Sequence, residues 1–393
     1  MTTTYNNKEL SLPFDEILLN NGYEIKREKS SKNSITMTNS NKDTIVISRT
    51  YNGHYLYFNP NDSIDRGNIY SFCKNRGIKL KDLLSNKINI KELKHNLSES
   101  KDINNDKILD DFKALNSLKN ENFLVSKRLI DKEILSSFLH SMKEDNFHNV
   151  CIPTYTIKKI RDINTKILIQ SGYMTYLKTP MKKDKDGVIL KKAIKQICYG
   201  KKGLELLKSK DSKKSDIKNI IISESAIDSL SLLELKNLNP NETLLCSTNG
   251  TFTASHKEGL LYLKDEVKNV TFLLGFDSDE KGLIFSKEIK ELLKENVEVL
   301  KPSLKDFNDD LIVSKFLRLN KSFSINELEK SLNSFTQKIK EYASKNKLKE
   351  LKASLKILEN IKDKSKNYIS KESLANVDLA LKTSISKGLS YER

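Results

Sequence analysis

The sequence predicts an α/β fold, in which a parallel sheet between layers of helices is preceded by α+β segments and followed by a helical tail. Two observations lead to this prediction. Between residues 218 and 320, short apolar runs alternate with amphipathic stretches. From residue 321 to 393, apolar residues instead recur every three or four positions. Continuous apolar strands separated by helices are typical of a parallel sheet that is covered on both faces.

The alternation in residues 218–320 assigns each element of the sheet. The predicted strands cover residues 219–225, 243–250, 269–279 and 297–303, and the predicted helices cover residues 226–237, 255–266 and 284–295. In the tail, Ser324 and Glu327 have the spacing of a capping box. The apolar spacing that follows predicts an amphipathic helix or helical hairpin, which we expect to pack on the protein's own body rather than form a free coiled coil.

The segments before residue 218 predict two smaller units. Residues 1–98 are expected to form an α+β module that contains a hairpin over residues 43–60 and a short helix within residues 65–77. Residues 99–111 are polar and have no core pattern, so we interpret them as a linker. Residues 112–217 begin with a helical pattern over 123–142 and continue with strand-like pieces, which predicts a connecting α+β domain.

The charge of the chain favours a polyanionic partner. The 393 residues include 69 lysines and arginines against 52 aspartates and glutamates, a formal net charge of +17. A basic surface attracts nucleic acid, although the lysine-rich composition of an AT-rich genome explains the same excess. No apolar run is long enough to span a membrane, the first residues lack a signal-peptide pattern, and the four cysteines are scattered. We therefore expect a cytoplasmic protein with no membrane partner and no disulfide scaffold.

Acidic side chains follow two of the predicted strands. Glu224 lies at the end of the first strand, and Asp277 and Asp279 lie at the end of the third. In a strand, residues two apart point to the same face, so both aspartates are expected to address one ion, and Asp228 lies one helical turn after Glu224. Ligands of such sheets bind beyond the carboxyl ends of the strands. Taken alone, a DxD pair is usually a solvated surface turn, and a single glutamate such as Glu224 most often caps a helix or forms a salt bridge. The joint placement of these residues at neighbouring strand ends favours a site.

A cluster of carboxylate oxygens suits Mg²⁺ or Mn²⁺ rather than zinc. Such ions stabilise the charge that develops in phosphoryl transfer, and a carboxylate that is not wholly used as a ligand can act as a general acid or base. The sequence therefore predicts one or two divalent cations and no zinc. The expected ligands are Glu224, Asp277, Asp279 and Asp228, and the first three are also the expected catalytic residues.

The order of these motifs resembles the Toprim domain of bacterial primases, topoisomerases, OLD-family nucleases and recombination proteins. The resemblance rests on IIISESAIDSLSL (residues 220–232), STNG (247–250) and FLLGFDSDEKG (272–282). Glu224 matches the glutamate after the first strand, and Asp277 and Asp279 match the DxD pair after the third. KDFNDDL (residues 305–311) resembles the segment that closes the Toprim-like domains of plasmid and phage proteins. It implies supporting roles for Asp306, Asn308 and Asp309.

The upstream segments resemble the modules that precede such domains in mobile-element proteins. Residues 112–217 are similar to a domain of unknown function that occurs there, and residues 55–77 are similar to the end of a primase zinc-binding domain. The zinc ligands of that domain are missing, because only Cys73 is present and it lies within the predicted helix. The resemblance implies a zinc-less remnant, which serves either as a structural cap or in template recognition.

A negative metal site repels a phosphate backbone until cations fill it, so we expect flanking groups to hold the strand. The nucleic-acid-binding candidates are Lys201, Lys202, Lys281, Lys305, Asn249 and Gly250, with the loops that carry Lys182, Lys183, Lys185, Lys213 and Lys214. The competing interpretation is a solvated lysine surface.

Three functions remain open from the sequence. The first is primase-like nucleotidyl transfer in the replication or transfer of a plasmid, phage or other mobile element. The second is a Toprim nuclease in DNA processing or anti-phage defence, and the third is a non-catalytic DNA-binding accessory protein. The expected partner is single-stranded DNA or another nucleic acid, together with a helicase, a relaxase or another replication or defence protein.

Overall fold

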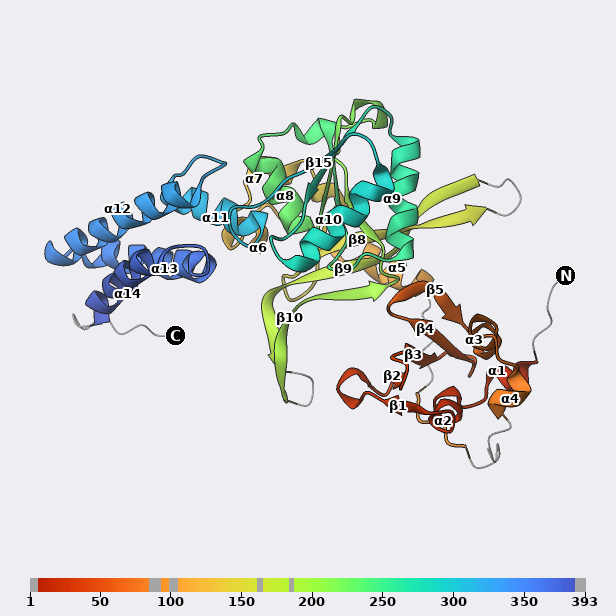
Figure 1. Cartoon of the computed structure of the whole chain (residues 1–393). Coiled ribbons are helices and arrows are strands. Elements are labelled where there is room, and N and C mark those ends of the chain that lie inside the picture. Colours follow the sequence, from red (N-terminus) through yellow and green to blue (C-terminus); the bar gives the residue numbers. More distant parts are fainter. Residues whose placement is uncertain (1–5, 85–92, 99–104, 161–164, 184–186, 386–393) are drawn as a thin grey trace. The chain divides into compact units, whose positions relative to one another are not determined.

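The computed structural model describes residues 6–84, 93–98, 105–160, 165–183 and 187–385. The chain separates into two compact units, residues 1–104 and 105–393 (Figure 1). This boundary falls inside the predicted linker. Residues 99–104 lie outside the described residues, whereas residues 105–111 belong to helix α5 (Asn105–Ala114), whose Phe112 packs against Tyr173.

The first unit contains an antiparallel sheet that packs against short helices. Its strands, in spatial order, are β1 (Tyr23–Ile25), β2 (Ser34–Asn39), β3 (Thr44–Arg49), β4 (Tyr55–Asn59) and β5 (Asp62–Gly67). Its helices are α1 (Asn7–Leu10), α2 (Phe14–Leu19), η1 (Arg27–Lys29), α3 (Ile69–Arg76) and α4 (Leu80–Leu84). The predicted hairpin is confirmed by the antiparallel pairing of β3 with β4. The predicted short helix is α3, and its Phe72 packs edge-to-face against Phe14 and Tyr57.

The second unit is built on one mixed sheet with the order β10-β9-β8-β11-β13-β12-β14-β15. Its antiparallel half consists of β8 (Val150–Ile160), β9 (Thr165–Lys183), β10 (Ile189–Gly200) and β11 (Leu204–Leu207). Its parallel half consists of β12 (Asn219–Ser223), β13 (Thr243–Ser247), β14 (Thr271–Gly275) and β15 (Val297–Val299). The short strands β6 (Asn116–Ser117) and β7 (Lys143–Glu144) attach to β8.

Strand β11 joins the two halves. It pairs antiparallel with β8 on one side and with β13 on the other, and all of its residues are buried. A single sheet therefore runs through both segments that the sequence separates at residue 218. A strand with hydrogen-bonding partners on both edges cannot be assigned to one domain from its own residues.

The parallel half carries helices on both faces, as predicted. Alternate residues of β12 point to opposite sides: Ile221 packs with α8 (Ala226–Leu235) and α11 (Phe307–Leu317), and Ile220 and Ile222 pack with α9 (Ala254–Glu266) and α10 (Glu280–Leu293). Because both faces are buried, the central residues of β12, β13 and β14 are apolar in a row. The predicted α/β fold class is thus confirmed, and the Toprim-type sheet is followed by a helical tail.

The tail forms helices α12 (Ile325–Ser344), α13 (Leu348–Ser365) and α14 (Lys371–Ile385). The capping box of Ser324 and Glu327 is present at the start of α12. Leu304 and Val313 belong to the same buried core as the three helices, so the tail packs on the body of its unit, as expected.

The helical pattern predicted over residues 123–142 is wrong in extent. The segment forms α6 (Phe123–Ser126), α7 (Lys132–Ser136) and the short turn η3 (Leu139–Ser141). Leu129 interrupts it with a left-handed φ of 55°, and the Asp131 side chain caps α7 anew.

In the described part of the chain, no helix is long and apolar enough to cross a membrane.

Candidate active site

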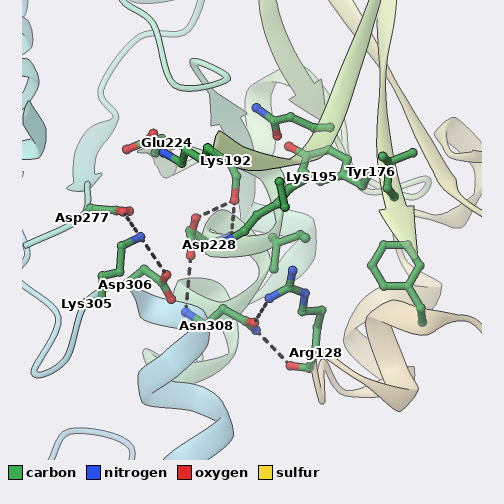
Figure 2. A pocket seen from close by; sticks show the side chains of 16 residues that line it. Arg128, Tyr176, Lys192, Lys195, Glu224, Asp228, Asp277, Lys305, Asp306 and Asn308 are labelled. Carbon is green, nitrogen blue, oxygen red and sulfur yellow. Dashed lines mark hydrogen bonds and ion pairs between the residues drawn. The ribbon is translucent and has the colours of Figure 1, made fainter. Parts of the chain in front are cut away.

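A pocket lies where β12 and β14 end and α8 and α11 begin (Figure 2). Acidic groups at these ends face basic and polar groups from the antiparallel half of the sheet. The lining includes Glu224, Asp228, Asp277, Lys305, Asp306, Asn308, Arg128, Tyr176, Lys192, Lys195 and Gln196. Figure 2 shows Asp277, Lys305 and Asp306 together at one side of the pocket, with Lys195 and Tyr176 across it. The structure therefore brings three of the four predicted cation ligands to one pocket.

Asp279, the fourth predicted ligand, has a different position. Strand β14 ends at Gly275, so Asp277 and Asp279 lie beyond the strand, and the expectation that they share a strand face is wrong. Asp279 is exposed and is the N-cap of α10, where its Oδ1 accepts a hydrogen bond from Gly282 N at 2.9 Å. The turn is tight: a Cβ on Gly282 would lie 2.1 Å from the Asp277 carbonyl oxygen.

Asp277 is held by a lysine. Lys305 Nζ lies 2.8 Å from Asp277 Oδ2 and 3.7 Å from Asp306 Oδ2. Burial raises the pKa of Asp277 to about 6, with Glu224 and Asp306 adding to the rise and Lys305 opposing it. Burial lowers the pKa of Lys305, but its two carboxylate partners reverse this and hold that pKa above its usual value. The ammonium group thus neutralises part of a crowded negative site.

Asp228 is the most deeply buried carboxylate of the pocket. It accepts hydrogen bonds from Ser225 Oγ at 2.5 Å and from Asn308 N at 3.4 Å. Burial raises its pKa well above the usual value, and the neighbouring charges of Asp306 and Asp277 raise it further. The neighbouring carboxylates thus add negative charge around a group that is already buried.

Glu224 lies against the turn that follows β13. A Cβ on Gly250 would lie 3.1 Å from Glu224 Oε1, and Gly250 has a φ of +70°, so the backbone conformation disfavours a larger residue there. Lys281 Nζ lies 3.8 Å from Glu224 Oε1 and donates to the Gly250 carbonyl. Asn249 is buried and donates to Gly203 O at 3.3 Å, so its side chain faces the protein interior.

The remaining lysine candidates differ in exposure. Lys201 is exposed, whereas Lys202 is partly buried. Burial lowers the pKa of Lys202, the positive charge of Lys281 lowers it further, and the carboxylates of Glu205 and Glu224 oppose the change. Lys281 therefore lies beside Glu224, and Lys305 lies beside Asp277. Lys202 lies close enough to Glu205 and Glu224 for their charges to affect its pKa. Lys201 is held through its backbone, which donates to Ser171 O at 2.9 Å.

The donor chemistry of the pocket fits a hard divalent cation, because the available groups are carboxylate oxygens whose mutual repulsion a cation would relieve. As they are arranged, however, no three His, Cys, Asp or Glu side chains within the described ranges converge closely enough to hold a metal ion. Lysine ammonium groups lie beside Asp277 and Glu224 instead.

The supporting residues at the start of α11 hold the pocket together. Asp306 is the N-cap of this helix and accepts from Asp309 N at 2.8 Å. Asn308 is buried and donates to Arg128 O at 2.9 Å and to Ser231 Oγ at 3.0 Å. Asp309 forms an ion pair with Lys364, so its carboxylate joins helix α13 of the tail to helix α11.

Sequence reasoning missed the wall opposite the carboxylates, which strands β9 and β10 and the loop after α6 form. Arg128, Tyr176, Lys192 and Lys195 line the pocket, although they lie far from Glu224 in the chain. It also missed Glu205, which is buried in β11 and accepts a hydrogen bond from Tyr176 OH at 2.8 Å. Burial raises the pKa of Glu205 to about 7. The one available signal was a glutamate inside the apolar run LELL.

Residues 221–311 match the family model described as Toprim-like. The chain contains a Toprim-like domain. This domain extends from β12 into α11 and includes Glu224, Asp228, Asp277, Asp279 and the KDFNDDL segment. Arg128 and the lysines of β10 lie outside it, so the pocket combines the Toprim-like domain with the segment that precedes it.

The solved structures to which the chain is similar include two from bacteriophage T7. One is the crystallised primase fragment of the primase-helicase protein, with 18% identity, 47% of this chain and 66% of that chain covered, and a TM-score of 0.24. The other structure contains the lagging-strand DNA polymerase with primase domains bound to an RNA/DNA hybrid and dTTP. Its match has 20% identity, covers 47% of this chain and 81% of that chain, and has a TM-score of 0.24. No curated protein matches the chain.

Proposed function

We propose that this chain is a primase-like nucleotidyltransferase that requires Mg²⁺ or Mn²⁺ and acts on single-stranded nucleic acid. The observation that supports this function is the pocket of the Toprim-like domain, where Glu224, Asp228 and Asp277 face Arg128 and Lys195. Carboxylates for a cation beside cationic side chains for phosphates are the groups that phosphoryl transfer needs. A role in the replication or transfer of a mobile element, in the cytoplasm, is part of the same proposal.

Each side chain has a role in this proposal. Asp277, Asp228 and the helix cap Asp279 would have to converge to hold a divalent cation, which would supply charge stabilisation at the reacting phosphate. Arg128, Lys192 and Lys195 bind phosphate oxygens from the opposite wall. Glu224 lines the pocket with a more exposed side chain than Asp277, and it is the group that we assign to accept the proton of the attacking hydroxyl. Asn308 and Asp306 position the loop that carries Lys305.

The function is tested by incubating the full-length protein with a single-stranded DNA template, Mg²⁺ or Mn²⁺ and labelled nucleotides. New or extended strands support the proposal. Shortened template would instead identify a nuclease that uses the same carboxylates with water as the nucleophile. Intact template without new strands would identify a binding protein.

The matched control is Asp277→Asn, which keeps the shape of the side chain and removes its charge. We expect it to abolish nucleotide incorporation while the circular dichroism spectrum stays that of the wild type. Activity that survives this change would assign catalysis elsewhere in the chain. A partner such as a helicase or a relaxase remains a proposal for co-purification experiments.

A further inference from the structure

We propose that the outer part of the β9–β10 hairpin is an arm that binds single-stranded nucleic acid and leads it to the carboxylate pocket. We call this arm the basic ribbon. It consists of residues 178–183, at the end of β9, and residues 187–196, which are the first part of β10 and the two residues before it. Figure 1 shows the two strands extending away from the helices of their unit. The direction toward the pocket rests on the proposed function, whereas the binding itself does not.

Residues 178–196 contain seven lysines and two aspartates, and both aspartates, Asp184 and Asp186, lie outside the described residues. The described residues of the basic ribbon carry positive charge only. No aspartate or glutamate occurs among them, and every lysine is exposed: Lys178, Lys182, Lys183, Lys191, Lys192 and Lys195. In the described chain, none of these lysines forms an ion pair with a carboxylate, whereas Lys214, Lys218 and Lys257 elsewhere pair with Glu266, Glu242 and Glu288. Uncompensated positive charge concentrated on one element attracts a polyanion.

The shape of the basic ribbon suits an extended strand. Lys178 to Lys183 span roughly 17 Å at the usual rise of about 3.3 Å per strand residue. The register of β9 and β10 shifts between Ile189 and Ile194 and again before Gln196. Such bulges twist a ribbon and turn its side chains in new directions. Lysines are thereby presented along the arm rather than on a single flat face.

The basic ribbon is continuous with the pocket. Lys192 and Lys195, at its base, line the same cavity as Glu224, Asp228 and Asp277. A nucleic-acid strand that binds along the arm therefore reaches the carboxylates of the Toprim-like domain. This continuity favours nucleic acid over an anionic lipid surface, although exposed Val188 and Ile189 also suit a membrane.

The ribbon carries no exposed aromatic ring between Lys178 and Lys195 on which bases could stack. We therefore expect binding through the phosphate backbone, with little dependence on base sequence and strong dependence on salt. This expectation separates the ribbon from a sequence-reading surface.

The test compares two full-length variants with the same change in charge. In the first, Lys182, Lys183 and Lys191 become Ala; none of them lines the pocket. In the second, Lys349, Lys352 and Lys356 of α13, which are also exposed, become Ala. Anisotropy of a labelled oligo-dT strand is measured without metal or nucleotides over a range of salt concentrations.

We expect the ribbon variant to lose at least tenfold in affinity at low salt. Its log–log salt dependence should be shallower by roughly 2, because each lost single-strand phosphate contact removes about 0.7. The α13 variant should retain the wild-type slope. A ribbon variant in which the same three lysines become Arg preserves the charge and should bind like the wild type, which guards against loss of folding.

Equal affinity and slope in the ribbon and α13 variants would overturn the proposal. So would ribbon-dependent binding to phosphatidylserine vesicles that exceeds binding to oligo-dT, since it would assign the arm to a membrane. Failure of the proposed function looks different: a wild type that binds oligo-dT through the ribbon but neither extends nor cuts DNA would leave the arm in place and remove the enzymatic assignment.

Discussion

Lys305 Nζ lies 2.8 Å from Asp277 Oδ2, so a side chain of the protein holds the carboxylate that we assign to a divalent cation. The lysine and the cation compete for the same oxygen. The pocket is therefore expected to release Lys305 from Asp277 when the cation binds, and this leaves the ammonium group available for a phosphate. The relationship leads to the first prediction.

Lys305→Met should tighten Mn²⁺ binding, because the competing charge is removed. We expect a gain of about tenfold, which corresponds to about 1.4 kcal/mol, by isothermal titration calorimetry. The metal-free variant should also unfold at a lower temperature, since Asp277 and Asp306 lose their shared counter-charge. The control is Lys345→Met, which removes an exposed ion pair with Glu341 on α12. Unchanged or weaker Mn²⁺ binding would contradict the competition.

Asp279 is expected to have separable structural and cation-binding roles. Asp279→Ala removes the N-cap of α10 and should cost about 1 kcal/mol of the free energy of unfolding, whereas Asp279→Asn keeps a good cap. Because Asn lacks the charge, Asp279→Asn should still weaken Mn²⁺ binding. Asp131→Asn changes the N-cap of α7, outside the pocket, and serves as the control. If Asp279→Asn binds Mn²⁺ like the wild type, Asp279 is a helix cap and not a ligand.

Asn308 is expected to stabilise the pocket through its buried amide. Asn308→Ala leaves the Arg128 carbonyl and Ser231 without this partner, which should lower the free energy of unfolding by about 1–3 kcal/mol. Denaturant titration measures the loss. The exposed Asn360→Ala on α13 should change stability little. A similar small effect at both positions would show that the α11 loop does not depend on the amide.

Glu205 should make the stability of the protein depend on pH. Burial raises its pKa from 4.5 to about 7, so its favourable contribution is complete below pH 4.5 and is lost as the pH rises through about 7. The loss is on the order of 3 kcal/mol, since one pKa unit corresponds to about 1.4 kcal/mol. Denaturant unfolding at pH 5 and pH 8 should therefore show a smaller decrease for Glu205→Gln than for the wild type. Parallel decreases in the two proteins would assign the pH dependence to other groups, such as Asp310.

The first unit should fold without zinc. Cys73 is buried in its core, and burial raises the pKa of this thiol to about 11, so it packs as a neutral apolar group. Treatment with a chelator should leave the melting of this unit unchanged. Stoichiometric zinc in untagged protein, measured by elemental analysis, would show this prediction to be wrong.

The parallel half of the sheet and its helices can be predicted from local sequence patterns. Burial on both faces makes Ile220, Ile221 and Ile222 apolar in a row, and the capping box of Ser324 and Glu327 marks the start of α12 within four residues. Such patterns are local, because the residue type at a position depends on whether that position of its own helix or strand is buried or exposed. For the same reason Glu224 and Asp277 are recognisable as groups that follow buried strands.

The groups that lie opposite these carboxylates come from distant parts of the chain, and they become known only from the folded structure. Whether a particular lysine pairs with Asp277 or lies on the basic ribbon depends on packing between segments far apart in the chain. In a lysine-rich sequence, the residues next to a lysine do not predict its partner. Strand β11 illustrates this limit, since its hydrogen bonds to β8 and β13 join two predicted domains into one sheet. Asp279 is a second case: β14 ends at Gly275, and the resulting turn makes this aspartate a helix cap. The ends of helices and strands, and the contacts between them, depend on how segments from the whole chain pack against one another. A short stretch of sequence therefore does not determine them.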